Sequence, residues 1–135
     1  KKLENKIEIL NPIYNKDEKK KIYLNSDCFI LPSRSENFGI SIAEALSFGV
    51  PVITTTDTPW KIIKDNNAGM VFDFSEENLL NYLNKFMQLS VNELEIMSKN
   101  ALDIIKYNFD KDKIFQDYLN FYKKIYNNES IISLK

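Results

Sequence analysis

Residues 29–53 read FILPSRSENFGISIAEALSFGVPVI, and this stretch predicts the core of the fold. It begins inside a mostly apolar run, residues 27–31, which is typical of a strand buried on both faces of a parallel sheet. A polar loop follows, and then a helix is predicted from about Gly39 to Phe48. Gly49 comes directly after this helix, where a left-handed backbone favours glycine. The next buried strand is predicted over residues 50–54.

Two carboxylates flank the start of the predicted helix. Glu36 lies in the loop before it, and Glu44 lies on its second turn. The free N–H groups and the dipole at a helix start favour an anion, of which phosphate is the common one. Carboxylates accept hydrogen bonds from hydroxyl groups, which sugars provide. This arrangement predicts a site for one polar ligand that carries both kinds of group.

The composition excludes several classes of function. The 135 residues carry 18 basic and 19 acidic side chains, so nothing electrostatic favours nucleic acid as a partner. The chain has no histidine, which excludes Ser-His-Asp and Cys-His catalysis. The single cysteine, Cys28, fits a reducing compartment and is predicted to be a core residue rather than a nucleophile. Lys19, Lys20 and Lys21 are predicted to form a solvated helix face. The inner side of the same helix is expected to consist of Ile22, Tyr23 and Leu24.

Strands and helices alternate in the first half of the chain. Further strands are predicted over residues 6–10 and 68–72, and further helices over residues 16–25 and 60–64. Thr58 and Pro59 suit the N-cap and first turn of that last, short helix. The order predicts an α/β fold, a Rossmann-like parallel sheet of about four strands flanked by helices. Ligands of such sheets bind beyond the carboxyl ends of the strands, where the loop with Glu36 lies.

The second half of the chain is predicted to be helical. Helices are expected over residues 75–89, 90–108 and 111–126, the second with a capping box of Ser90 and Glu93 and the third capped by Asp110. In the third, apolar side chains recur at the spacing of a buried face, and we expect them to form core or a docking surface. They are Ile114, Tyr118, Phe121, Tyr122 and Ile125. Residues 127–135 are expected to form a frayed tail.

The pattern P-S-x-x-E-x-F-G-x-x-x-x-E-A-L-x-x-G-x-P-V-I, residues 32–53, resembles the signature of the retaining nucleotide-sugar glycosyltransferases of family 4, also called glycosyl transferases group 1. The resemblance extends over about residues 3–126. It implies the GT-B fold, in which two Rossmann-like domains enclose the active site. Residues 1–126 would form the later part of the C-terminal, donor-binding domain. The Arg and Lys that bind the donor diphosphate in this family have no match in this chain.

The resemblance also implies roles for individual residues. Glu44 would accept hydrogen bonds from the ribose hydroxyls, and Glu36, the implied catalytic residue, would bind and orient the transferred sugar. Backbone N–H groups of three residues would hold the sugar and the diphosphate: Phe38, Gly39 and Ile40. The base pocket is expected along Asn11, Pro12 and Ile13. The implied reaction transfers a sugar to a glycan or glycolipid acceptor with retention of configuration, and it needs neither a metal ion nor a cofactor.

The implied partners are a nucleotide-diphosphate sugar and an N-terminal acceptor domain of the same protein. Without that domain the 135-residue chain is expected to be inactive. The resemblance implies a cytoplasmic protein of polysaccharide biosynthesis, with peripheral contact at the inner membrane face through the other domain. Alternatives are a non-catalytic module that binds a nucleotide or docks a partner, and another GT-B enzyme such as a nucleotide-sugar epimerase. A structural α/β domain is a third.

Five further residues have two interpretations each. Residues 54–56, all threonine, either form a polar strand exit or face the donor. Trp60 either packs against the neighbouring helix or lines the donor pocket. Arg34, the single arginine, either takes a surface or ion-pair role or reaches a phosphate.

Overall fold

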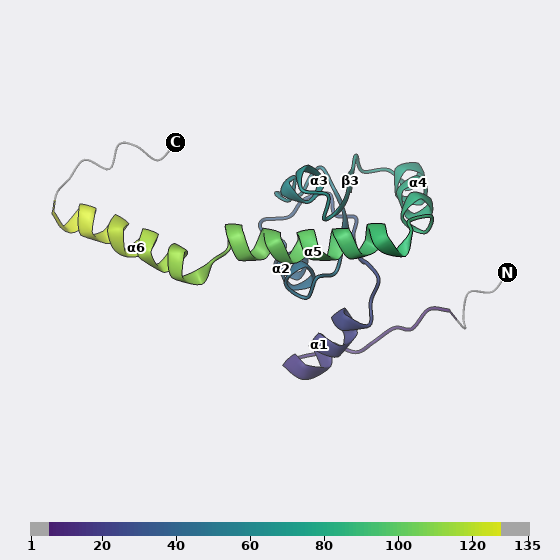
Figure 1. Ribbon diagram of the computed structural model, residues 1–135, viewed down its shortest axis with the longest axis horizontal. Helices are drawn as coiled ribbons and strands as arrows, with labels where there is room; N and C mark the ends of the chain where they lie inside the picture. Colours follow the sequence, from purple (N-terminus) through teal and green to yellow (C-terminus); the bar gives the residue numbers. More distant parts are fainter. Residues whose placement is uncertain (1–5, 128–135) are drawn as a thin grey trace.

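The centre of the fold is a three-stranded parallel sheet, described by a computed structural model that covers residues 6–127 (Figure 1). The strands are β1 (Phe29–Leu31), β2 (Val52–Thr55) and β3 (Gly69–Phe72), in the spatial order β1-β2-β3. Both pairings are parallel. The sequence prediction of an α/β fold with a parallel sheet is therefore confirmed.

The two strands beside the sequence motif differ in burial. β2 is buried at all four positions, as predicted for a strand covered on both faces. β1 is not, because it lies at the edge of the sheet and Ile30 is 41% exposed. The prediction that residues 27–31 are buried on both faces is wrong for that reason.

The predicted strand at residues 6–10 is also wrong. The described chain offers it no neighbouring strand, and a single extended segment cannot satisfy its own backbone groups. These residues form an exposed arm that leads to the first helix (Figure 1). Ile7 and Ile9 are 63% and 93% exposed. The sheet has three strands among the described residues instead of about four.

Within the described residues, six helices surround or extend the sheet. They are α1 (Lys16–Leu24), α2 (Ile40–Ser47), α3 (Ile62–Asp65), α4 (Glu76–Phe86), α5 (Val91–Asn108) and α6 (Lys111–Tyr126). Ser90 and Glu93 form the predicted capping box at the start of α5, and Asp110 caps α6 as predicted. Gly49 has the expected left-handed backbone after α2, with φ of 72°.

The short helix α3 starts later than predicted. Its N-cap is Lys61, and no side chain caps it. Thr58 turns back instead, and its hydroxyl donates a hydrogen bond to the Thr55 carbonyl at 3.0 Å. Thr58 is therefore part of the turn after β2 and not the N-cap of a helix.

The sheet separates two apolar clusters. Adjacent residues of β2 point to opposite faces, so Val52 belongs to one cluster and Ile53 to the other. The larger cluster joins the sheet to α1, α2, α3 and the later part of α5, and the smaller one joins it to α4 and the earlier part of α5. α5 spans both clusters, and Figure 1 shows it crossing the whole body.

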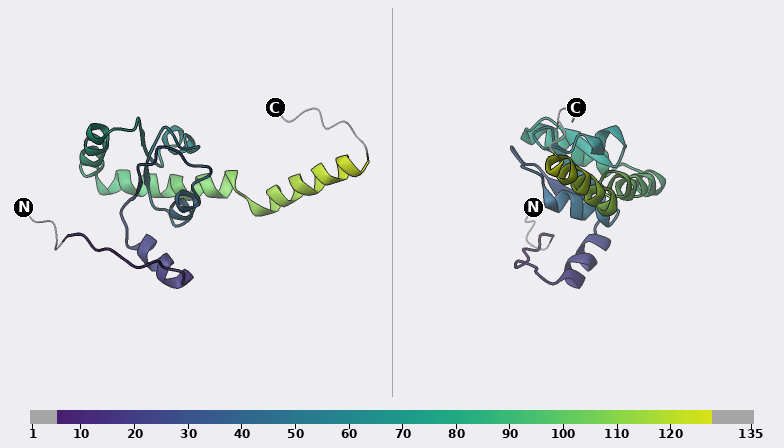
Figure 2. Two further views of the ribbon diagram at one scale, coloured as in Figure 1. Left: turned by 180° about the vertical axis from the view of Figure 1, so that it is seen from behind. Right: turned by 90° about the vertical axis from the view of Figure 1, so that its left-hand side faces the viewer.

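The last helix leaves this body. α6 extends away from the end of α5 in the left-hand view of Figure 2, and none of its residues is buried. Tyr118 and Tyr122 are 60% and 63% exposed. The predicted apolar face exists, but it is not part of the core, because no described element packs against it. The predicted frayed tail lies outside the described residues from position 128 onward.

Candidate functional site

The loop before α2 ends in an uncapped helix start. Gly39 is the N-cap residue, with a left-handed backbone (φ 76°, ψ 60°), and no side chain bonds to the first turn. The first helical hydrogen bonds run from Ile42 and Ala43 to the Gly39 carbonyl. The N–H groups before Ile42 therefore have no helical acceptor and are available to a ligand.

Only glycine suits position 39. A Cβ atom there would lie 3.2 Å from both Ile42 Cδ1 and Trp60 Nε1, and a positive φ is unfavourable for any residue with a side chain. The place that a side chain would take is filled by two buried side chains of the core, so glycine is needed here for packing as well as for the backbone turn.

Trp60 holds the loop in place from the buried side. Its indole N–H donates a hydrogen bond to the Phe38 carbonyl, and its side chain is 1% exposed. Its ring lies 5.4 Å from the ring of Phe38 and 5.4 Å from that of Phe109, at the end of α5. Of the two interpretations of Trp60, the structure supports packing: the tryptophan sets the backbone position of Phe38.

Two threonines of β2 hold the other end of the loop. The Thr54 hydroxyl donates to the Leu31 carbonyl at 2.9 Å, and the Thr55 hydroxyl donates to the Ser33 carbonyl. Both side chains are fully buried. They therefore position the loop between β1 and α2, and neither is exposed to a ligand.

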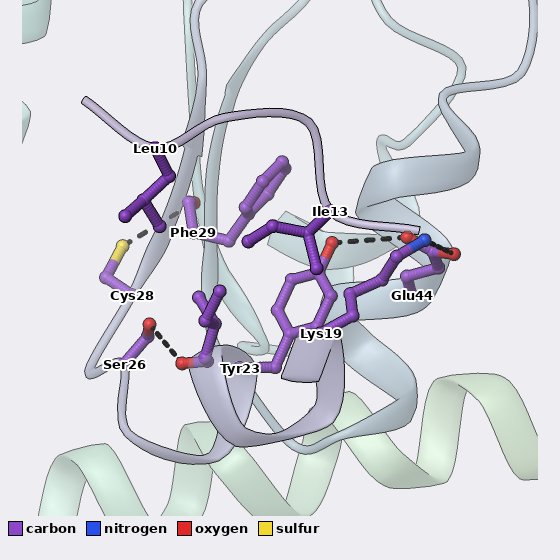
Figure 3. A pocket seen from close by; sticks show the side chains of 9 residues that line it. Leu10, Ile13, Lys19, Tyr23, Ser26, Cys28, Phe29 and Glu44 are labelled. Atoms are coloured by element: carbon purple, nitrogen blue, oxygen red, sulfur yellow. Dashed lines mark hydrogen bonds and ion pairs between the residues drawn. The ribbon is translucent and has the colours of Figure 1, made fainter. Parts of the chain in front are cut away.

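Glu44 meets two residues of α1. Lys19 Nζ lies 2.9 Å from Glu44 Oε1, and the Tyr23 hydroxyl donates to Glu44 Oε2 at 3.3 Å (Figure 3). The lysine and glutamate side chains are 38% and 35% exposed, so the pair contributes little to stability, about 0–1 kcal/mol. Its main effect is to fix the direction of the Glu44 carboxylate.

A pocket of about 250 Å³ opens beside this carboxylate, between α1, β1 and the arm that precedes α1 (Figure 3). Its lining combines an ion pair with apolar side chains. The lining residues are Leu10, Ile13, Lys19, Ile22, Tyr23, Ser26, Cys28, Phe29 and Glu44. An apolar wall with a few polar groups at one end is typical of a small-molecule site.

Of the residues predicted for the ligand site, Ile13 and Glu44 line this pocket. Glu36 is half-buried in the loop, and its carboxylate makes no hydrogen bond or ion pair with residues 6–127. Other predicted residues stand at the surface outside the lining: Phe38, Ile40, Asn11 and Pro12. The structure thus places Glu44 in the pocket and Glu36 outside its lining, in the loop before α2.

Lys19 and Tyr23 were missed by the sequence prediction, which assigned Lys19 to a solvated face and Tyr23 to the inner side of its helix. The available signal was their spacing. Residues four apart lie on the same face of a helix, so an inward Tyr23 implies that Lys19 points the same way. Burial and the Glu44 carboxylate raise the pKa of Tyr23 to about 12, so its hydroxyl remains a hydrogen-bond donor at neutral pH.

Cys28 and Arg34 both make ordinary packing contacts: Cys28 is not a nucleophile, and Arg34 lies at the surface. Burial raises the pKa of the Cys28 thiol to about 12, which makes it a poor nucleophile at neutral pH, as predicted. The sequence predicts a core residue, but Cys28 is half-buried: it packs against the smaller apolar cluster and lines the pocket. The Arg34 guanidinium lies over the Phe74 ring, 4.5 Å from its centroid. That contact is a surface cation–π interaction.

The comparison with protein families agrees with this fold. Residues 1–103 match the family model described as glycosyl transferases group 1. The chain belongs to this family. Its sequence is 30% identical over 125 residues to a glycogen synthase of Kosmotoga olearia, and the match covers 87% of this chain. It is 27% identical over 110 residues to the O-antigen biosynthesis glycosyltransferase WclY of Escherichia coli, with 82% covered.

Solved structures of glycosyltransferases share the fold. Sucrose-phosphate synthase from Thermosynechococcus elongatus superposes with a TM-score of 0.71 over 80% of this chain, at 19% identity. WaaG, a glycosyltransferase involved in lipopolysaccharide biosynthesis, superposes with a TM-score of 0.60 over 69% of this chain, at 27% identity. The chain is therefore a GT-B glycosyltransferase domain.

These relatives are much longer than this chain. It covers 26% of the glycogen synthase and 30% of WclY. It covers 27% and 25% of the two solved chains. Among residues 6–127, no helix is both long and apolar enough to cross a membrane.

Proposed function

We propose that this chain binds the nucleotide-diphosphate sugar of a retaining glycosyltransferase. The nucleotide occupies the pocket beside α1, and its ribose hydroxyls donate to Glu44. The diphosphate lies at the start of α2, where Phe38, Gly39 and Ile40 offer backbone N–H groups. The transferred sugar lies beyond it, with one hydroxyl on Glu36. Asn11, Pro12 and Ile13 are assigned to the base, and Ile13 is the one that already lines the pocket.

The observation that carries this proposal is that one short helix, α2, both places Glu44 in the pocket and has an uncapped start. Glu44 lines the pocket and lies on the same short helix whose first turn has no side-chain cap. A nucleoside diphosphate has hydroxyls at one end and an anion at the other. The carboxylate suits the first, and the N–H groups together with the helix dipole suit the second.

The proposed transfer replaces one bond at the anomeric carbon by another on the same face. The bond from this carbon to the diphosphate oxygen breaks as the acceptor hydroxyl oxygen forms the new glycosidic bond. The hydroxyl proton passes to the departing diphosphate. Negative charge grows on the diphosphate during this step, and the helix N–H groups stabilise this charge. The proposed step uses no metal ion.

For the acceptor, we propose only the chemical class. We propose a glycan or glycolipid hydroxyl, supported by family membership and by the WclY and WaaG likenesses. Because the chain covers about a quarter of its relatives, we propose that a further domain of the same protein supplies the acceptor site. The proposed setting is the cytoplasmic face of a membrane, reached through that domain. The 135-residue chain by itself is expected to bind the donor without transferring the sugar.

The first test is titration of the chain with UDP, GDP and ADP, followed by heteronuclear NMR. We expect at least one of them to shift the amide signals of Phe38, Gly39 and Ile40. Glu44→Ala should weaken its binding about tenfold, the usual cost of losing a hydrogen bond to a charged group. Glu95→Ala on the exposed face of α5 is the matched control and should leave the affinity unchanged.

The second arm separates binding from transfer. In a protein of the relatives' length, Glu36→Ala should lower turnover of a sugar donor by more than it lowers nucleoside diphosphate affinity. This is expected because Glu36 is assigned to the sugar alone. Binding without any turnover would instead support a non-catalytic nucleotide-binding module. If no nucleoside diphosphate binds, or if Glu44→Ala changes nothing, the proposed site is wrong.

A further inference from the structure

We propose that Lys19 and Tyr23 are positioning residues that orient Glu44, and that this arrangement makes the site select ribose over 2′-deoxyribose. The inference rests on the proposed function, in which Glu44 receives the ribose hydroxyls. It adds two residues of α1 to the site and a specific choice between two classes of nucleotide.

The geometry around the carboxylate supports this role. Lys19 Nζ contacts Oε1 and the Tyr23 hydroxyl contacts Oε2, so each oxygen of Glu44 has one donor (Figure 3). A carboxylate has roughly four lone-pair directions, two on each oxygen. Two directions therefore remain. A ribose ring presents two neighbouring hydroxyls, at the 2′ and 3′ positions, and can use both.

Tyr23 is held firmly enough to serve as a reference point. It is 9% exposed, and its ring stacks on Phe48 at 5.4 Å with an interplanar angle of 18°. The Phe29 ring lies 6.1 Å away on the edge strand. α2 and β1 thus fix the tyrosine, and the tyrosine in turn limits how the Glu44 side chain can rotate.

Lys19 completes the arrangement from the same face of α1. Its ammonium has three donors, and Glu44 receives one of them. The lysine also lines the pocket, so its contact with Oε1 holds the Glu44 side chain at the pocket wall. A carboxylate held in one orientation loses a hydrogen bond when a bound nucleotide lacks one hydroxyl. That loss discriminates between analogues more strongly than a change in apolar contact does.

The experiment measures the ratio of dissociation constants for 2′-deoxy and ordinary nucleoside diphosphates. The 135-residue chain is titrated with ADP, GDP and UDP and with 2′-deoxy-ADP, 2′-deoxy-GDP and 2′-deoxyuridine diphosphate, followed by amide NMR shifts. For whichever base binds, we expect the unmodified chain to prefer the ribonucleotide about tenfold.

Three variants locate the source of this preference. Lys19→Met and Tyr23→Phe should each lower the ratio to about threefold or less, chiefly by weakening the affinity for the ribonucleotide. Lys19→Arg keeps the charge and should restore most of the ribose preference. Lys20→Met, one position along α1 and exposed, is the matched control and should leave the ratio unchanged. Thermal unfolding of each variant shows that it is folded.

The outcomes separate the two proposals. If no nucleoside diphosphate binds the unmodified chain, the proposed function is wrong and this inference fails with it. If nucleotides bind but Lys19→Met and Tyr23→Phe keep the ribose preference, only the inference is overturned. A Lys19→Met variant that binds ribonucleotides more tightly would also overturn it, because the lysine would then be competing with the ribose. Equal weakening of both nucleotide classes would assign Lys19 to the phosphates instead.

Discussion

At the scale of single residues, the loop before α2 depends on three buried side chains that donate hydrogen bonds to backbone carbonyl groups of β1 and the loop. Trp60 binds the Phe38 carbonyl, and Thr54 and Thr55 bind the carbonyls of Leu31 and Ser33. Each bond satisfies a backbone group that would otherwise be costly to bury. The open helix start is therefore held by donors beneath it.

Trp60→Phe tests this support. The variant keeps an aromatic ring but removes the N–H donor and leaves a small cavity, so we expect the free energy of unfolding to fall by about 2 kcal/mol. Urea unfolding measures this change. Tyr107→Phe, at an exposed tyrosine, is the control and should change the value by less than about 0.5 kcal/mol. An unchanged midpoint for Trp60→Phe would show that the indole N–H does not support the loop.

At the scale of elements, helix caps follow the local sequence closely. Ser90 and Glu93 form the capping box of α5: the Ser90 N–H donates to Glu93 Oε2 at 2.7 Å, and the Glu93 N–H donates to Ser90 Oγ at 3.4 Å. Hydrogen bonds from the Ser90 side chain and backbone lower the pKa of Glu93 below its usual value of 4.5. The cap is therefore linked to pH.

The direction of this pH dependence follows from the sign of the shift. A carboxyl group with a lowered pKa in the folded chain stabilises it above the unfolded pKa, and this contribution is lost as the pH falls from about 4.5 through the folded value. Glu93→Gln keeps a hydrogen-bonding side chain but cannot titrate. We expect its urea midpoint to fall less than that of the unmodified chain between pH 6 and pH 3, roughly the window on either side of the usual value.

Glu95→Gln is the control for this measurement. It lies on the same helix, is exposed and takes no part in the cap. It should show the same acid sensitivity as the unmodified chain. If Glu93→Gln and Glu95→Gln respond alike, the capping box contributes nothing to the pH dependence.

At the scale of the whole molecule, the body ends at Phe109. Its ring lies 5.4 Å from that of Trp60 and 5.9 Å from that of Phe38, so it joins the end of α5 to the loop of the site. α6 begins two residues later, extends away from the body and buries none of its residues (Figures 1 and 2). The stability of the body should therefore not depend on α6.

Shortening the chain tests this division. A chain that ends at Asp110 should have the same urea midpoint as the full chain, because no buried contact is removed. Phe109→Ala in the full chain should lower the free energy of unfolding by about 2 kcal/mol, since a half-buried aromatic contact is lost. A large loss of stability on removing α6 would mean that this helix packs against the body in solution.

Much of the fold could be predicted because its signals are local. The buried strand β2, the helix α2, the glycine that ends it and the caps of α5 and α6 each depend on neighbours within a few residues. The failures involve partners. Residues 6–10 have the pattern of a strand, but no strand of the described chain pairs with them. The apolar side of α6 is not core, because none of its residues is buried within residues 6–127, and its use as a docking surface stays a prediction.

The sequence by itself determined the α/β class, the helix start after Gly39 and the resemblance of the chain to glycosyltransferases. These features depend on backbone preferences and on the spacing of apolar residues, which involve only neighbours along the chain. Only the tertiary structure decided which side chains meet Glu44. Lys19 and Tyr23 are 25 and 21 residues away along the chain and reach it through the packing of α1 on α2. Contacts of that separation depend on how elements pack, and no pattern within either helix specifies them.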